Sequence, residues 1–193
     1  METERETRRG SLEIRLHGRG GQGTVTMAAL LVDAAFRDGW HALGFPAFGT
    51  ERTGAPVTAF VRLSDEPIRD RSQIRTPRIV VVQDPTLAAA VDLTEGLEPG
   101  GTVLVNAEIV PPRLRDLAGV TVIAVPVTAL ATEHLGSPIT STAMLGLLAG
   151  ATGLVRIESV CAAVRDRFSG SIGEKNEALV RAAHTLALGR KAA

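Results

Sequence analysis

Residues 18–23 read Gly-Arg-Gly-Gly-Gln-Gly, so four glycines fall within six positions. Glycine adopts positive φ angles without strain and lets another group approach the backbone closely. A strand-like segment at 12–16 precedes this turn, and a long helical pattern at 24–36 follows it. Because a helix start presents free N–H groups and the positive end of the helix dipole, the turn predicts a site for a phosphate or a carboxylate. The alternatives are a turn that packs tightly on a partner and a purely structural turn.

The spacing Gly18-x-Gly20-x-x-Gly23 also matches the dinucleotide-binding fingerprint. In that fingerprint an acidic residue ends the second strand, about 20 residues further on, and holds a ribose hydroxyl. Here residues 40–45 read Trp-His-Ala-Leu-Gly-Phe and contain no acid, while Asp38 comes before this segment and Glu51 well after it. NAD binding of the ordinary kind is therefore not expected.

The segment 45–56, Phe-Pro-Ala-Phe-Gly-Thr-Glu-Arg-Thr-Gly-Ala-Pro, is a long apolar loop with repeated Gly and Pro breaks. Loops of this kind are usually functional or covered by a partner. Arg52 is suited to bidentate contact with a phosphate or carboxylate, although a local pair with Glu51 explains it equally well. We expect this loop and the glycine turn to lie on an interface with a partner chain. Arginines at 62, 69, 71 and 75 form either an anion-binding patch or separately solvated charges.

The chain has 193 residues, 45% of them hydrophobic, and a formal net charge of +0. We expect a single domain over 11–190 and a charged, disordered tail over 1–10 that is not a signal peptide. The neutral charge argues against a nucleic-acid surface, and no run is long enough to span a membrane, so a cytoplasmic location is expected. A single cysteine, Cys161, excludes an iron–sulfur cluster ligated by cysteines of this chain alone, and the four histidines lack metal-binding spacing.

Strand and helix patterns alternate along the chain. Strands are expected at 12–16, 57–63, 79–82, 102–106 and 120–125, and helices at 22–37, 87–91, 142–152, 157–168 and 174–188. Such units predict an α/β fold: a mostly parallel Rossmann-like sheet with helices on both faces, and a helical C-terminal third.

Periodicity also predicts which faces are buried. The first helix is expected to face the core with Val25, Ala28, Ala29, Val32 and Phe36, and the last with Leu179, Ala182, Ala183 and Leu186. Cys161 lies on the apolar stripe of the 157–168 helix and is expected in the core. The first strand alternates apolar residues with Glu13, Arg15 and His17, so one of its faces is either solvated or covered by a partner.

Six short motifs occur in order: Gly-x-Gly-Gly-Gln-Gly at 18–23, Glu-Arg-x-Gly-Ala-Pro at 51–56, Arg-x-Ser-Asp-x-Pro-Ile-Arg at 62–69, Asp-Pro-Thr-Leu at 84–87, Thr-Ala-Met-Leu-Gly at 142–146 and Glu-Lys-Asn at 174–176. With this combination the chain resembles the gamma subunit of 2-oxoacid:ferredoxin oxidoreductases, most closely the pyruvate and 2-oxoglutarate type. The resemblance covers nearly all of residues 11–188. No single motif is specific, but the combination is.

The resemblance implies a multi-subunit enzyme that oxidatively decarboxylates a 2-oxoacid, makes an acyl-CoA and passes electrons to ferredoxin. It implies partner subunits of alpha, beta and delta type that carry thiamine diphosphate and iron–sulfur clusters. By this analogy the chain has no catalytic residue and helps form the coenzyme A (CoA) site and the subunit interface. The residues that the analogy nominates for this role are Gly18, Arg19, Gly20, Gly21, Gln22, Gly23, Glu51 and Arg52. The single cysteine and the lack of a Gly-Asp-Gly thiamine motif agree with it.

Two positions depart from the family pattern. Thr53 stands where Arg is expected in Glu-Arg-Arg-Gly, and Ser141 stands where Asn commonly precedes Thr-Ala-Met-Leu-Gly. These departures bear on the exact substrate more than on the family. Two other hypotheses stay open: the small subunit of an indolepyruvate-type oxidoreductase, which shares the glycine turn, and a free-standing nucleotide-binding oxidoreductase domain.

Overall fold

A computed structural model describes residues 11–47 and 54–191. The tail expected over 1–10 and two of the nominated site residues, Glu51 and Arg52, lie outside the described residues. The predictions made for them stay predictions.

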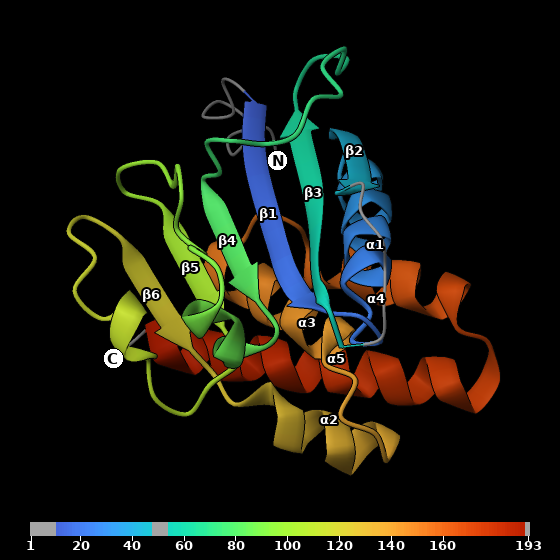
Figure 1. Cartoon of the computed structure of the whole chain (residues 1–193). Helices are drawn as coiled ribbons and strands as arrows, with labels where there is room; N and C mark the ends of the chain where they lie inside the picture. The colour runs from blue at the N-terminus through green and yellow to red at the C-terminus, as the bar shows by residue number, and fades with distance from the viewer. Residues whose placement is uncertain (1–10, 48–53, 192–193) are drawn as a thin grey trace.

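The described residues form a six-stranded sheet with the strand order β2-β3-β1-β4-β5-β6 (Figure 1). The strands are β1 (Ser11–Arg19), β2 (His41–Pro46), β3 (Pro56–Ser64), β4 (Ile79–Val82), β5 (Thr102–Val105) and β6 (Thr121–Ala124). β1, β4, β5 and β6 pair in parallel, whereas β3 runs antiparallel to both of its neighbours, β1 and β2. The expected α/β fold with a mostly parallel sheet is confirmed, and one antiparallel strand is built into it.

One large hydrophobic core joins the α-helices to one face of this sheet. The α-helices of the described segments are α1 (Thr24–Arg37), α2 (Val127–Leu135), α3 (Ser141–Thr152), α4 (Ile157–Arg167) and α5 (Gly170–Lys191). Ile14 and Leu16 of β1 enter this core, and Cys161 of α4 lies in it as expected. α3 is buried from Ser141 to Ala151 and packs most extensively against α5. The predicted helical C-terminal third is thus the main support of the sheet.

A second, smaller core covers the opposite face of β4 and β5. Here the helices are two short 3-10 helices, η1 (Pro85–Ala89) and η2 (Pro112–Leu114), which cover the strand valines together with the irregular segments around them. The α-helix expected at 87–91 is therefore a 3-10 helix that begins and ends earlier. Each of these helices starts at a proline and is followed within a few residues by a turn, so neither extends into a longer helix.

The predicted core-facing stripe of α1 is only partly right. Ala28 is buried and Val32 packs against the core, but Ala29 is exposed, Phe36 is 71% exposed and Val25 is 38% exposed. The buried residues of α1 are Thr24, Met27, Ala28, Leu30, Leu31, Ala34 and Ala35. Both stripes have helical spacing, so periodicity alone could not choose between them. The contact with β1, β2 and β3 selects the face with the two leucines.

The start of α5 and one of its stripe residues also differ from the prediction. The helix begins at Gly170, so Gly173 lies inside its first turns instead of preceding them. A Cβ at Gly173 would overlap the carbonyl oxygen of Phe168, which explains a glycine within a helix. Leu186 is exposed, whereas Ala187 is buried and continues the stripe from Ala183. α2 was not predicted at all, although the buried pair Val127 and Ala131 has helical spacing.

Glycines on α3 let it approach α5 closely, and this contact yields a matched test. A Cβ at Gly146 would overlap the carbonyl oxygen of Val180, whereas a Cβ at Gly189 of α5 would meet nothing within 4 Å. Gly146→Ala is expected to lower the free energy of unfolding by about 1–3 kcal/mol through overpacking. Gly189→Ala is expected to raise it by about 0.5–1 kcal/mol, because alanine is the better helix former. Urea unfolding measures both; equal stability of the two variants would refute the close approach.

Candidate functional site

The glycine turn joins β1 to α1 at the carboxyl edge of the sheet. Gly21 and Gly23 have φ angles of 95° and 79°, which a residue with a side chain rarely adopts. A Cβ at Gly18 would lie 2.5 Å from Oε1 of Gln83, and one at Gly23 would lie 2.8 Å from Oγ of Ser141. The turn therefore packs against two distant segments of its own chain, and these glycines have a structural reason to be there.

Arg19 ties the turn to the segment after β4. Its Nε lies 2.8 Å from Oδ2 of Asp84, its Nη2 donates to Oγ1 of Thr86 at 2.8 Å, and its Nη1 donates to the carbonyl of Gly54 at 3.1 Å. Burial would raise the pKa of Asp84, but hydrogen bonds from Thr86 and Arg19 hold it below its usual value. Gln22 supports the turn by accepting from the backbone N–H of Arg19 at 2.8 Å. The positive charge of Arg19 is thus already matched within the chain.

Polar side chains at the ends of β4 and β5 continue this network. Oγ1 of Thr24 donates to Oε1 of Gln83 at 2.6 Å, and Nδ2 of Asn106 donates to the carbonyl of Gln83 at 2.9 Å. Oδ1 of Asn106 accepts from the backbone N–H of Val127 at 2.9 Å, at the start of α2. Gln83 and Asn106 were not predicted from the sequence as site residues. The available signal was one polar residue directly after each short buried strand.

Two of the sequence motifs meet inside the helical layer. Oγ1 of Thr142, at the start of α3, donates to Oδ1 of Asn176 at 2.8 Å, and both residues are buried. The helix expected at 174–188 would have placed Asn176 in its first turn, but α5 begins at Gly170. Asn176 lies beyond the first turn of α5, where Nδ2 also donates to the carbonyl of Ile172 at 2.9 Å. Asn176 fixes the two helices relative to each other.

The polar face of β1 is covered by the chain itself. Arg15 and His17 are each only 7% exposed. Nε of Arg15 donates to Nε2 of His17 at 3.0 Å, and Nη2 donates to the carbonyls of Leu93 and Glu95 at 3.1 and 2.7 Å. From the sequence we expected this face to be covered by solvent or by a partner chain. In the structure the segment around 93–95 covers much of it.

His17 is neutral in this setting. Burial, together with the charge of Arg15, lowers its pKa to about 4. Because Nε2 accepts from Arg15, the proton of the neutral ring lies on Nδ1, which faces Oγ1 of Thr58 at 3.4 Å. The imidazole is therefore a fixed polar group of the cavity and is not suited to proton transfer near neutral pH.

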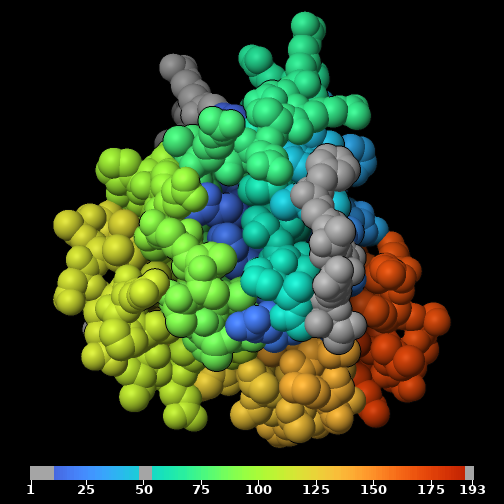
Figure 2. Space-filling model, in the orientation of Figure 1, coloured from blue at the N-terminus to red at the C-terminus, as the bar shows by residue number. Residues whose placement is uncertain are grey.

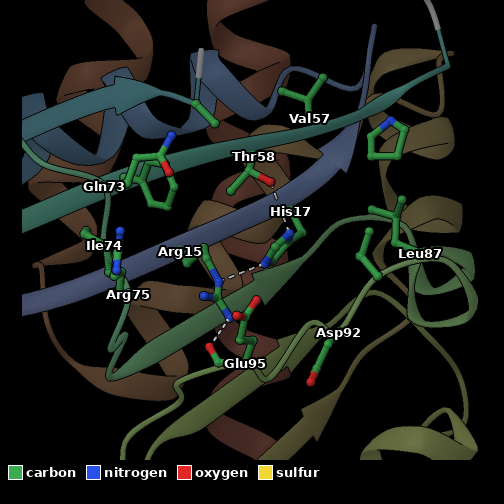
Figure 3. Close-up of a pocket in the computed structure, with 14 residues that line it drawn as sticks. Arg15, His17, Val57, Thr58, Gln73, Ile74, Arg75, Leu87, Asp92 and Glu95 are labelled. Atoms are coloured by element: carbon green, nitrogen blue, oxygen red, sulfur yellow. Dashed lines mark hydrogen bonds between the residues drawn. The ribbon is translucent and has the colours of Figure 1, made fainter. Parts of the chain in front are cut away.

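A cavity of about 460 Å³ lies over this polar face. Figure 2 shows it as a hollow in the front of the molecule, with blue atoms of the early chain at its bottom. In Figure 3, Arg15 and His17 rise from β1, Thr58 comes from β3, and Gln73 and Arg75 lie along one side. The volume is in the range of small-molecule sites.

The position of the cavity agrees with the topology of the sheet. After β1 the chain continues to β2 and β3 on one side, and it returns to β4 on the other. α1 leaves β1 toward the main core, and η1 leaves β4 toward the second core. Such a switch point opens a crevice at the carboxyl ends of the strands, where α/β proteins bind their ligands.

The suggested arginine patch is only partly assembled, because Arg62 and Arg75 line one hollow with Glu13 and Asp70. Arg62 is buried and pairs with Glu13 at 2.7 Å and with Asp70 at 3.3 Å, so its charge is neutralised. The arginines at 69, 71 and 75 are exposed, and of these Arg75 lines the cavity. The four arginines do not form one anion site.

The described residues offer little for metal binding, membrane insertion or thiol chemistry. Within 11–47 and 54–191, no group of three or more His, Cys, Asp or Glu side chains is arranged to hold a metal ion. No helix in the same residues is long and apolar enough to cross a membrane. Burial raises the pKa of the Cys161 thiol, which keeps it protonated.

The structure is that of an α/β protein with a cavity beside the switch point of its sheet. A family model described as "Pyruvate ferredoxin/flavodoxin oxidoreductase" matches residues 13–186. The chain belongs to this family, and the predicted resemblance is confirmed.

Individual relatives agree with this assignment. The pyruvate/ketoisovalerate oxidoreductases common subunit gamma of Thermococcus kodakarensis is 53% identical over 169 residues, which cover 86% of this chain and 91% of that one. The pyruvate synthase subunit PorC of Methanothermobacter marburgensis is 46% identical over 173 residues, 90% of this chain and 96% of the relative. The crystal structure of pyruvate oxidoreductase subunit PORC from Thermotoga maritima matches with a TM-score of 0.78 and 32% identity, over 92% of this chain and 97% of that one.

The low pKa of His17 predicts a specific loss of stability in acid. Between the unfolded pKa of 6.5 and the folded pKa of about 4, the unfolded chain binds a proton that the folded chain does not. Above pH 6.5 this group therefore does not lower the free energy of unfolding. As the pH falls from 6.5 toward 4, the free energy of unfolding decreases by roughly 3 kcal/mol because of this group. Urea unfolding at pH 7.0 and 4.5 should show a larger acid loss for the native chain than for His17→Gln. Equal losses in both would contradict the buried neutral histidine.

Proposed function

We propose that this chain is the gamma subunit of a multi-subunit 2-oxoacid:ferredoxin oxidoreductase that acts on pyruvate. The supporting observation is its similarity, over nearly its whole length, to gamma and PorC subunits of pyruvate enzymes. One of those relatives is named for both pyruvate and ketoisovalerate, so a branched 2-oxoacid is the second candidate substrate.

In the proposed reaction the 2-oxoacid loses CO₂, its acyl group is transferred to CoA, and two electrons pass one at a time to ferredoxin. Thiamine diphosphate stabilises the carbanion of the decarboxylation, and iron–sulfur clusters carry the single electrons. The donor set of this chain does not suit a cluster, because its one cysteine is buried and protonated. We therefore assign these cofactors to partner subunits of alpha, beta and delta type.

The proposed contribution of this chain is to bind and orient CoA and to form a subunit interface. The start of α1 is suited to an anion: Gly23 is the N-cap, no side chain caps the helix, and its first turn holds no acid. Arg19 forms an ion pair with Asp84, so its positive charge attracts an anion at this helix start less than the sequence suggested. The candidate cation for a CoA phosphate is therefore Arg52, which follows Glu51 in the sequence.

The proposed function is tested by purification of the native complex through a tag on this chain. The preparation is expected to contain partner subunits, iron and thiamine diphosphate, and to reduce a viologen dye with pyruvate and CoA. The chain expressed alone is expected to be colourless and inactive. Stoichiometric iron or thiamine diphosphate in the isolated chain would contradict the assignment of these cofactors to partner subunits.

The assignment of Arg52 is tested by Arg52→Ala in the same complex, with Arg69→Ala as the control because Arg69 is exposed and does not line the cavity over β1. Loss of one charge-assisted contact is worth about 1.5–3 kcal/mol, so the KM for CoA should rise roughly ten- to a hundredfold. The KM for pyruvate should not change in either variant. An unchanged KM for CoA in an intact complex would contradict the assignment of Arg52 to CoA binding and would favour a structural role for it.

A further inference from the structure

Gln83 and Asp84, which directly follow β4, hold the glycine turn on two sides. Oε1 of the buried Gln83 accepts from Oγ1 of Thr24 at 2.6 Å, inside the fold. Oδ2 of Asp84 accepts from Nε of Arg19 at 2.8 Å and from Nε2 of Gln22 at 3.4 Å. The side chain of Asp84 is 14% exposed, so this second contact lies nearer the surface. The turn is therefore held by the end of a neighbouring strand as well as by its own backbone.

Arg19 extends this contact to two further segments. Its Nη2 donates to Oγ1 of Thr86 at the start of η1, and its Nη1 donates to the carbonyl of Gly54. Backbone bonds run beside it, from the N–H of Gly20 to the carbonyl of Ala55 at 2.9 Å and from the N–H of Gly54 to the carbonyl of Gly20 at 3.2 Å. A guanidinium presents its donors in a rigid fork, which the single ammonium group of lysine cannot reproduce. Arg19 thus joins the turn to Gly54 and to η1.

These contacts leave backbone donors at the start of α1 unused. Within the residues that the structure describes, the N–H groups of Gly21, Gly23 and Thr24 have no hydrogen-bond partner. A hydrogen bond weakens steeply when its donor and acceptor are misaligned, so an anion bound here depends on the direction of these N–H groups. A residue that fixes the turn can therefore change the affinity for an anion without touching it.

A site built on charge alone would not contain Asp84. Its carboxylate repels an anion and pairs with Arg19, the cation of the turn. Its two oxygens instead serve separate partners: Oδ1 accepts from the N–H of Thr86 at 2.9 Å, which caps η1, and Oδ2 accepts from Arg19. Asparagine has one acceptor oxygen and cannot keep both sets of bonds. The contribution of Asp84 to the turn is therefore its geometry.

We propose that Asp84 is a positioning residue, which acts through Arg19 to hold the N–H groups of the glycine turn in the direction that an anionic group of CoA requires. The identity of this anion rests on the proposed function. Arg19 is then part of the support of the turn and is not itself a ligand of the anion.

The sign of the effect of Asp84→Asn separates positioning from charge. In the purified complex this substitution should raise the KM for CoA roughly three- to tenfold and leave kcat and the KM for pyruvate unchanged. Arg19→Lys, which keeps the charge but loses the fork, should raise the KM for CoA in the same way. If Arg19 bound the anion directly, removal of the carboxylate would lower this KM. A lower KM in Asp84→Asn, or an unchanged KM in Arg19→Lys, would overturn the proposal.

The matched control is Asp70→Asn. Asp70 accepts from the backbone N–H of Ser72 two positions on and pairs with Arg62, as Asp84 does with Thr86 and Arg19, but it makes no contact with the turn. Its KM for CoA should equal that of the native complex. A rise as large as in Asp84→Asn would show a general loss of structure and would overturn the specific role.

Hydrogen exchange of the complex without CoA tests the support of the turn independently of the reaction. Residues 18–26 and 54–58 should exchange faster in Asp84→Asn than in the native complex or in Asp70→Asn. Faster exchange in a complex that shows no CoA-dependent pyruvate oxidation would support the positioning role and refute the proposed function. Native exchange and a native KM for CoA in an active Asp84→Asn complex would uphold the proposed function and overturn the positioning role.

Discussion

The alternation of side chains along β1 is the constraint on which the rest of the structure depends. Successive residues of a strand point to opposite faces, so Ile14 and Leu16 enter the main core while Arg15 and His17 face the cavity. β1 is paired on both sides, antiparallel to β3 and parallel to β4. A slip of one residue would place the arginine in the apolar core and expose the leucine, so this register fixes core and cavity together.

Motifs that are far apart in the sequence meet at the carboxyl edge of the sheet and in the helices below it. The glycine turn binds Asp84 through Arg19 and packs on the start of α3 through Gly23. α3 is in turn joined to α5 by Thr142 and Asn176. The carbonyl of Gly54 adds the end of the 51–56 motif to the same network. Five of the six motifs therefore contribute residues to one set of contacts, which explains why their combination is informative when each alone is not. The contacts of Arg62, in the 62–69 motif, are separate from this set.

The ionisable groups of the described residues agree with a binding role better than with a catalytic one. The cavity histidine, His17, has a pKa of about 4, far from the value near neutrality that suits a general acid or base. The thiol of Cys161 is buried, and the charge of Arg19 is matched by Asp84. The described residues thus offer polar groups for contacts, and neither His17 nor Cys161 has a pKa suited to proton transfer near neutral pH.

Most of the strands and helices, the family and the polar face of β1 could be predicted from the sequence, because these follow from local periodicity and from motifs. β2 and α2 were not predicted. The sequence did not determine which stripe of α1 is buried, because two stripes had the same spacing and only contact with the sheet distinguishes them. It also missed Gln83 and Asn106 and the cavity above Arg15, which join residues some 20 to 80 positions apart. Tertiary structure decided these features because burial and hydrogen bonding depend on neighbours in space, which no local pattern records.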